Sequence, residues 1–491
     1  MISRLKYILT GCIALVFTGA TAQTSQVLYF MNLPQNHLMN PALRPSNTAY
    51  VGLPVISGMY FGVNNNFFNY SDLFTKSPTS DSLFSFLSSE KATDAFLEKV
   101  NKKNSISPQI SLPLLGFGFK GKNGLYFFFD ITEKIEGNMV LPGDIMRFML
   151  KGNGDFVGEN IDLSSLRMDM KYYREFGFTI SKEISNKLRV GIRPKLYTGV
   201  MSTKFENRSL GVKVDEYYNH TIYADFTANF SGPFNVSTDN EGNLDSINFD
   251  DNYFRSFNAF ASMENKGLGI DIGATYKLLN DKVLVSASLT DIGYIRWKHN
   301  VTNLTTKGNF VFDGLDMSDV VGGDEDIADV GDRLLDSLKN AYVLTKTGDP
   351  FTSWMAPGIT IGGSYNLNKN ISFGLLSYSR FIGKQVRESL TFSANMNLSN
   401  TFSLSLGYSL QNHRADNFGA GIAFRASIFQ FYLISDRIPV KWDRVKLEDN
   451  STIIVPANWN TLSLRMGMNL TFGNKVRKKD DKPMIQNEQT F

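Results

Sequence analysis

The feature that most restricts the fold of this chain is a long and regular alternation of apolar and polar residues. In the segment 462–472, every second residue is apolar, from Leu462 to Phe472, and the residues between them are Ser, Arg, Gly, Asn and Thr. Successive side chains of a β-strand point to opposite faces, so a period of two predicts a strand with one apolar and one polar face. A helical repeat of 3.6 residues would mix both kinds of side chain on every face.

Two pairs of alternating segments predict β-hairpins. The segments 391–398 and 402–410 flank the turn-forming pair Ser399-Asn400, and the segments 268–276 and 283–289 have the same arrangement. Asn, Asp and Ser favour the backbone conformations of tight turns. With the other alternating stretches, the pattern predicts an all-β chain of about fourteen strands, most of them antiparallel neighbours. Those stretches lie near 50–63, 109–119, 124–133, 168–182, 188–206, 216–230, 358–366, 370–381, 417–425 and 427–436.

Strand length and polar-face chemistry favour a membrane barrel over a soluble fold. Several alternating segments reach the ~9–11 residues that cross a bilayer at a tilt, whereas soluble strands commonly have about five or six. Their polar faces carry isolated charges such as Asp271, Lys277, Arg425 and Arg465. The lumen of a barrel accepts such groups, and the core of a β-sandwich does not. We expect a transmembrane antiparallel β-barrel in the cell outer membrane, and a secreted β-sandwich array stays open as the alternative.

Aromatic residues near predicted strand ends give a further indication. They make up 13% of the 491 residues. Membrane barrels place aromatic side chains in belts at both interfaces. We expect such belts to include Tyr294, Trp297, Trp442 and Trp459.

Composition excludes several other classes of protein. The 50 Lys and Arg residues nearly balance the 47 Asp and Glu residues, so the chain shows no basic excess for nucleic acid and no net charge typical of disorder. One cysteine excludes a disulfide scaffold and a cysteine-based zinc cluster. No stretch approaches the ~18 apolar residues of a membrane-spanning helix, apart from the shorter run near the start of the chain.

The first 22 residues are predicted to be a secretory signal peptide. Two basic residues precede the apolar run 8–17, and Ala20-Thr21-Ala22 forms a cleavage site before Gln23. The segment 9–12 also matches the site at which bacterial lipoproteins are cleaved and acylated at Cys12. That alternative is open, but the apolar run continues beyond the cysteine, which favours cleavage before Gln23.

Long polar segments separate some of the predicted strands. The largest are 232–265 and 299–356. Helical patterns at 81–100 and 327–344 predict short helices in these loops. The segment 299–356 also carries many acidic residues between 313 and 332. Their spacing is not that of an EF-hand, so we interpret this segment as a solvated loop.

No motif predicts catalysis or a cofactor. The sequence 116–121 satisfies G-x-G-x-x-G, but a strand-like run follows it where a dinucleotide site needs a helix. The four histidines lack a metal-binding spacing, and no G-x-S-x-G elbow is present. We expect no enzyme activity, no catalytic residues, no bound metal and no cofactor.

One strand carries a row of cations that could bind a ligand. In the segment 189–196, the period of two places the apolar residues toward lipid and three cations toward the lumen. Such a row could hold an anionic head group in a confined space. The alternative is that lumen acids such as Asp271 or Glu175 pair with the cations. Pro194 lacks an N–H, so we also expect a bulge or kink there. The three candidate ligand-binding cations are Arg189, Arg193 and Lys195.

The N-terminal region resembles a known family. The segments 28–35 and 39–42, together with 289–293, are similar to uncharacterised outer-membrane barrels from Gram-negative bacteria of the Bacteroidetes type. That family in turn resembles the long-chain fatty-acid transporter barrels, which also place an Asn-Pro-Ala segment near the mature N-terminus. In this chain the matching residues are Asn40, Pro41 and Ala42.

The resemblance implies a fourteen-stranded barrel with an internal plug. On this basis residues 23–47 are the plug, with Asn40-Pro41-Ala42 as its turn, and 48–473 form the barrel. The chain departs from the usual pattern because a charged tail, 474–491, follows the last strand. We expect this tail to be periplasmic.

The resemblance also implies passage or binding of small hydrophobic or amphipathic molecules, with outer-membrane lipid as the surroundings. Two alternatives remain at this point. One is a non-transporting barrel that supports secretion or surface assembly through its long loops, and the other is a barrel enzyme that acts on lipid. The sequence identifies no protein partner.

Overall fold

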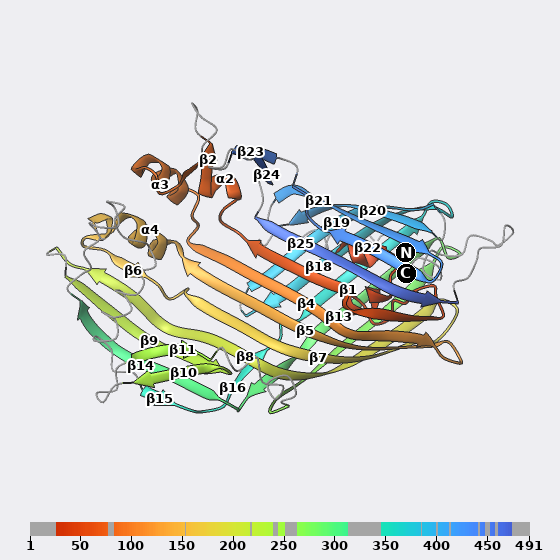
Figure 1. Cartoon of the computed structure of the whole chain (residues 1–491), viewed down its shortest axis with the longest axis horizontal. Helices are drawn as coiled ribbons and strands as arrows, with labels where there is room; N and C mark the ends of the chain where they lie inside the picture. Colours follow the sequence, from red (N-terminus) through yellow and green to blue (C-terminus); the bar gives the residue numbers. More distant parts are fainter. Residues whose placement is uncertain are drawn as a thin grey trace, which may run out of the picture.

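The computed structural model describes residues 26–76, 83–152, 154–216, 219–238, 244–250, 263–312, 345–383, 385–398, 401–411, 414–439, 442–446, 452–456 and 460–473. Fourteen strands form a closed antiparallel barrel, in which β25 pairs with β1 to complete the sheet (Figure 1). They are β1 (Ala49–Asn65), β4 (Lys103–Lys120), β5 (Leu125–Pro142), β7 (Arg167–Glu183), β8 (Leu188–Val214), β12 (Asn265–Leu278), β13 (Val283–Trp297), β17 (Gly358–Asn366), β18 (Ile371–Ile382), β19 (Gln385–Asn397), β20 (Phe402–Gln411), β21 (Arg414–Ala426), β22 (Phe429–Ser435) and β25 (Thr461–Phe472).

The two ends of the barrel differ. Tight turns such as 121–124 and 279–282 lie at the end where β1 begins and β25 finishes, and we call this the turn end. The longer segments 66–102 and 143–166 connect strands at the opposite end, which we call the loop end (Figure 1). Membrane barrels share this asymmetry of short turns and long loops.

The side chains confirm the predicted membrane barrel. On β12, the outward-facing Leu268, Ile272 and Tyr276 are 59%, 45% and 40% exposed, whereas Asp271 and Thr275 are 0% and 4% exposed. A soluble protein buries its apolar residues and exposes its charges. This wall has the reverse arrangement, with apolar side chains outside and polar ones inside, as a barrel surrounded by lipid requires.

One part of the sheet continues beyond the barrel at the loop end. β8 has 27 residues, far more than the ~9–11 that cross a bilayer, and its second half pairs with β9. An apolar cluster that includes Phe156, Val212 and Ile222 packs against this extension. The added strands are β6 (Asn160–Asp162), β9 (His220–Ser231), β14 (Val301–Phe312), β15 (Thr345–Thr347) and β16 (Phe351–Trp354).

Small elements decorate the loops. The prediction of a helix within 81–100 is confirmed by α3 (Glu90–Leu97), which Ser89 caps by accepting from the Ala92 N–H. No helix in the described ranges is long and apolar enough to cross a membrane. The other elements are α2 (Tyr70–Leu73), α4 (Gly143–Lys151), η2 (Val27–Phe30), η3 (Pro34–Leu38), η4 (Gly154–Phe156), β2 (Phe74–Lys76), β3 (Leu83–Ser85), β10 (Phe234–Thr238), β11 (Leu244–Phe249), β23 (Trp442–Lys446) and β24 (Thr452–Pro456).

The predicted bulge at Pro194 is wrong. β8 and β12 keep one register through the pair formed by Pro194 and Ile270. On the other side of β8, the ladder with β7 passes from Lys195 to Ile192 without pairing Pro194. The missing N–H coincides with a gap in the ladder with β7, and because the register is the same before and after the gap, β8 contains no bulge there.

The irregularities lie in two other strands. β1 shifts its register with β4 between Gly52 and Tyr60 and with β25 between Gly52 and Met59, and Val55 in this stretch has a φ of 67°. β13 contains a second bulge at Asp291, whose φ is 58°, because Ile270 pairs with Ile292 while Ile272 pairs with Leu289.

The bulge at Asp291 also explains why the prediction for Trp297 is wrong. Before the bulge, odd-numbered residues such as Val285 face outward, and after it even-numbered residues such as Tyr294 do so. Trp297 therefore points into the barrel and is 0% exposed, with its Nε1–H donating to Ser353 Oγ at 3.1 Å. Tyr294 is 38% exposed on the outer face.

Several predictions concern residues outside those that the structure describes. They include the signal peptide 1–22, the acidic residues between 313 and 332, the helix at 327–344, Trp459 and the tail 474–491. Trp442 is described and lies 54% exposed in β23, outside the barrel wall.

Candidate functional site

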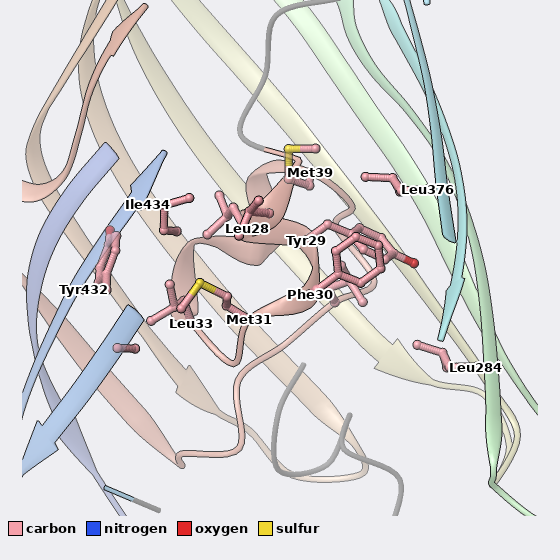
Figure 2. Packing of buried hydrophobic residues seen from close by; sticks show 13 residues of the cluster. Leu28, Tyr29, Phe30, Met31, Leu33, Met39, Leu284, Leu376, Tyr432 and Ile434 are labelled. Atoms are coloured by element: carbon pink, nitrogen blue, oxygen red, sulfur yellow. The ribbon is translucent and has the colours of Figure 1, made fainter. Parts of the chain in front are cut away.

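Residues 26–47 lie inside the barrel and are not part of its wall (Figure 2). They form two short 3-10 helices, η2 and η3, and Pro34, Pro41 and Pro45 prevent a longer helix. Their apolar side chains pack with inward-facing wall residues into what we call the lumen apolar cluster. It consists of Val27, Leu28, Tyr29, Phe30, Met31, Leu33, Met39 and Leu43 from this segment, and Leu284, Leu376, Ala423, Tyr432 and Ile434 from the wall.

Polar contacts fix the same segment to strands on several sides of the lumen. Gln26 Nε2 donates to Ser389 Oγ at 2.5 Å, and the Tyr29 hydroxyl lies 2.6 Å from Ser286 Oγ. These partners belong to β19 and β13, and Gln35 Nε2 donates at 2.9 Å to Asn469 Oδ1 on β25, which lies opposite β13 in the barrel order. The described part of the predicted plug therefore bridges the lumen, and its role as a plug stays a prediction.

The Asn40-Pro41-Ala42 turn occupies a recess made by two wall glycines. Gly191 and Gly273 pair across β8 and β12, and a Cβ on either would overlap this turn. Asn40 Oδ1 accepts from the Ala42 N–H at 2.9 Å, and Asn40 Nδ2 donates to a wall carbonyl at 3.2 Å. The amide of Asn40 thus holds the turn and attaches it to the wall.

Replacing Gly191 by valine is expected to displace the N-terminal segment while leaving the barrel wall intact. The added side chain would occupy the space of Pro41, and a turn tied to a carbonyl gives way more easily than a closed sheet. Chymotrypsin cleavage after Tyr29 or Phe30, followed by mass spectrometry, should accelerate about tenfold as local protection is lost. Gly116→Val is the control, because no atom lies within 4 Å of a Cβ there. Equal protection in both variants would contradict the recess.

A second group of side chains, which we call the lumen charge cluster, borders the N-terminal segment. Arg193 lies at the centre of this cluster and is 1% exposed. Its guanidinium contacts three carboxylates, at 2.5 Å to Asp130, 2.8 Å to Glu175 and 3.3 Å to Asp271. The planar guanidinium has enough donors for all three. The members are Asp130, Lys134, Glu175, Arg193, Lys195, Asp271 and Asp291.

The bulge of β13 completes this cluster. Lys195 Nζ lies 2.7 Å from Asp271 and 2.6 Å from Asp291, and the Asp291 N–H donates to Asp271 at 2.6 Å. The backbone turns out of the regular ladder at Asp291, which lets its carboxylate reach into the lumen. Asp291 belongs to the segment 289–293 that carries the family resemblance, but spacing alone did not identify it as a partner of Lys195.

The cluster also touches the N-terminal segment. His37 Nε2 lies 3.4 Å from Asp130, its Nδ1 lies 2.7 Å from the Pro34 carbonyl, and its ring stacks on Phe128 with centroids 4.2 Å apart. The lumen charge cluster and the N-terminal segment are therefore in direct contact at His37. In the described part of the chain, no three His, Cys, Asp or Glu side chains are grouped to hold a metal ion.

All three cations predicted to bind a ligand face the lumen and have carboxylate partners. Arg189 lies 3.2 Å from Glu183, which also binds Arg44 of the N-terminal segment. The pairs of Arg193 and Lys195 include the two acids, Asp271 and Glu175, that the sequence offered as alternatives. Anion binding by these three residues stays a prediction, and the geometry accounts for them as structural pairs.

Comparison with known proteins identifies one matching family. A model of the family described as "Family of unknown function (DUF5723)" matches residues 41–436, which is most of the chain. No curated protein matches the chain.

Three solved structures are similar in fold. The Ralstonia pickettii toluene transporter TbuX has 9% identity and a TM-score of 0.41, with 93% of this chain and 96% of that chain covered. A Pseudomonas aeruginosa FadL homologue has 9% identity and a TM-score of 0.41, with 93% and 100% covered. The P. putida toluene transporter TodX has 9% identity and a TM-score of 0.37, with 93% and 96% covered.

Proposed function

Because the chain belongs to the family of unknown function DUF5723, its role has to be inferred from its own lumen, and we propose that it binds or passes small hydrophobic or amphipathic molecules across the outer membrane. A polar solute needs only a polar channel, whereas an amphipathic one needs apolar and charged contacts side by side. The single observation that supports the proposal is the contact of the lumen apolar cluster with the lumen charge cluster through His37.

The N-terminal segment is the part of this interior that can move. Most of the lumen apolar cluster belongs to residues 26–47, which are held by side-chain hydrogen bonds and packing and are not hydrogen-bonded into the wall ladders. Shifting this segment would uncover apolar wall residues such as Leu284 and Leu376. An apolar ligand that takes the place of the segment would bury these wall residues again. Burial of apolar surface contributes roughly 25 cal/mol of favourable free energy per Å².

The bulge of β1 offers such a ligand a way to the lipid. Residues 53–59 leave the ladder with β4 and residues 53–56 leave the ladder with β25, and Val55 and Ile56 are 45% and 42% exposed on the outside. On the inside, Gly58 lies beneath Gln35 of the N-terminal segment. We propose that this part of the wall is the exit for apolar cargo, since lipid faces one side of it and the movable segment faces the other.

Mass spectrometry of lipids that co-purify with the barrel tests the proposed function. The composition of the bound fraction is compared with that of a total membrane extract from the same cells, which is the control for bulk lipid around the barrel. We expect one class of amphipathic molecule to be enriched about tenfold or more in the bound fraction, as a specific site requires. A bound fraction with the composition of the bulk membrane would contradict the proposal.

A further inference from the structure

Two guanidinium groups cross the lumen from one wall to the other. Arg380 and Arg387 pair across β18 and β19, and they are 8% and 2% exposed. Both reach residues of β5, although β7, β8, β12, β13 and β17 lie between β5 and β18 in the barrel order. The two side chains therefore form a crossbar inside the barrel.

The two members of this crossbar have unequal partners. Arg380 Nη2 lies 3.1 Å from a Glu136 carboxylate oxygen. Arg387 Nη2 instead donates to the neutral amide oxygen of Asn138 at 2.7 Å, and that oxygen also accepts from Ser107 Oγ at 2.9 Å. Among the residues that the structure describes, no carboxylate lies within ion-pair distance of Arg387.

A buried cation without a counter-charge is unfavourable. Buried charges in proteins are paired or coordinated, because an amide dipole replaces only part of the lost hydration. Two guanidinium groups meet one carboxylate at the crossbar, so the site carries an excess of one positive charge. The missing partner is an anion, and a guanidinium holds carboxylate and phosphate oxygens through parallel hydrogen bonds.

We propose that Arg387, with Arg380 beside it, binds the anionic head group, a carboxylate or a phosphate monoester, of the amphipathic molecule that the barrel takes up. This inference rests on the proposed function and deepens it. The inward-facing row of β18 runs from Arg380 to Leu376 of the lumen apolar cluster, a distance of ~13 Å along a strand. On β19, Ser389 lies two residues from Arg387 and binds Gln26. A head group at Arg387 would thus place its tail beside the apolar cluster.

Binding of matched amphiphiles to the purified barrel in neutral detergent tests the proposal. The probes are dodecanoate, dodecyl phosphate and the neutral dodecanol, measured by calorimetry on the wild-type chain, R387Q and N138D. The control is R208Q, because the Arg208 side chain is 78% exposed. N138D places a carboxylate beside Arg387 and is expected to preserve or strengthen the fold, so a loss of binding in it cannot be attributed to unfolding. We expect at least one anionic probe to bind the wild type and R208Q about tenfold more tightly than dodecanol, and both R387Q and N138D to abolish that preference.

The outcomes separate this inference from the proposed function. If dodecanol binds as tightly as the anions, or if N138D keeps the preference, the head-group site is wrong and uptake of amphipathic molecules still stands. If inorganic phosphate alone displaces the probes at equal concentration, the site holds a free anion and the assignment to a head group is overturned. If none of the three amphiphiles binds the wild type, the proposed function fails and the inference fails with it.

Discussion

Replacing Arg193 by methionine is expected to lower the free energy of unfolding by about 3–5 kcal/mol, the cost of removing one partner from a buried ion network. The guanidinium contacts Asp130, Glu175 and Asp271, and the variant would leave these carboxylates in a lumen where little water replaces it. Methionine has a similar length, so the loss reports on charge more than on volume. Urea unfolding of the barrel in detergent micelles, followed by tryptophan fluorescence, measures the change.

Two further variants identify the cause of that loss. Arg208→Met removes a guanidinium whose side chain is 78% exposed and lies 3.3 Å from Asp225, and an exposed pair of this kind contributes about 0–1 kcal/mol. Asp130→Asn in the Arg193→Met background removes one of the uncompensated acids and should restore part of the stability. If the double variant were no more stable than Arg193→Met alone, repulsion among the buried acids would not be the cause.

The strands and their two faces could be predicted from the sequence because both depend on local spacing. The alternation in 462–472 gave the apolar and polar faces of β25, and the hairpin 391–410 gave the pairing of β19 with β20. Each prediction needs only the period of two and one turn. The expected number of about fourteen strands is confirmed for the same reason.

Bulges could not be predicted, because a bulge changes the register without a fixed spacing. Asp291 has a positive φ that Asp tolerates, and nothing in the alternation around it required an extra residue. The extra residue reverses the inward and outward positions, which misplaced Trp297 in the predicted aromatic belt. At Pro194 the opposite error arose, since the missing N–H gave a chemical reason for a bulge, but the ladder with β7 skips this position and keeps its register.

Only part of the candidate site could be predicted from the sequence, for a related reason. The period of two placed Arg193 and Lys195 in the lumen and suggested Glu175 and Asp271 as partners, all of which lie on neighbouring strands. Contacts across the lumen depend on which residues stand at the same height on opposite walls. The Arg387 contact with Asn138 joins residues 249 positions apart, and spacing along the chain contains no signal for it.

Deleting residues 26–47 is expected to convert the closed barrel into an open pore, with conductance in planar bilayers on the order of tenfold above that of the intact chain. The wall does not depend on this segment for its hydrogen bonds, because β1 and β25 close the sheet from Ala49 onward. Removing it takes eight side chains out of the lumen apolar cluster and leaves a lumen lined by polar groups. Water and ions would then enter, which they cannot do while residues such as Tyr29 and Phe30 fill the turn end at 0% and 2% exposure.

Removal of the tail 474–491 is the matched control, because it shortens the chain by a comparable length at the other terminus and leaves residues 26–47 in place. That variant should conduct as little as the intact chain. The crossbar of Arg380 and Arg387 remains in the deletion variant, so its pore should favour anions, and Arg387→Gln in the same background should reduce that selectivity. An unchanged conductance after deletion of residues 26–47 would mean that the lumen is closed by the wall side chains themselves, and that the N-terminal segment is a structural lining with no part in gating.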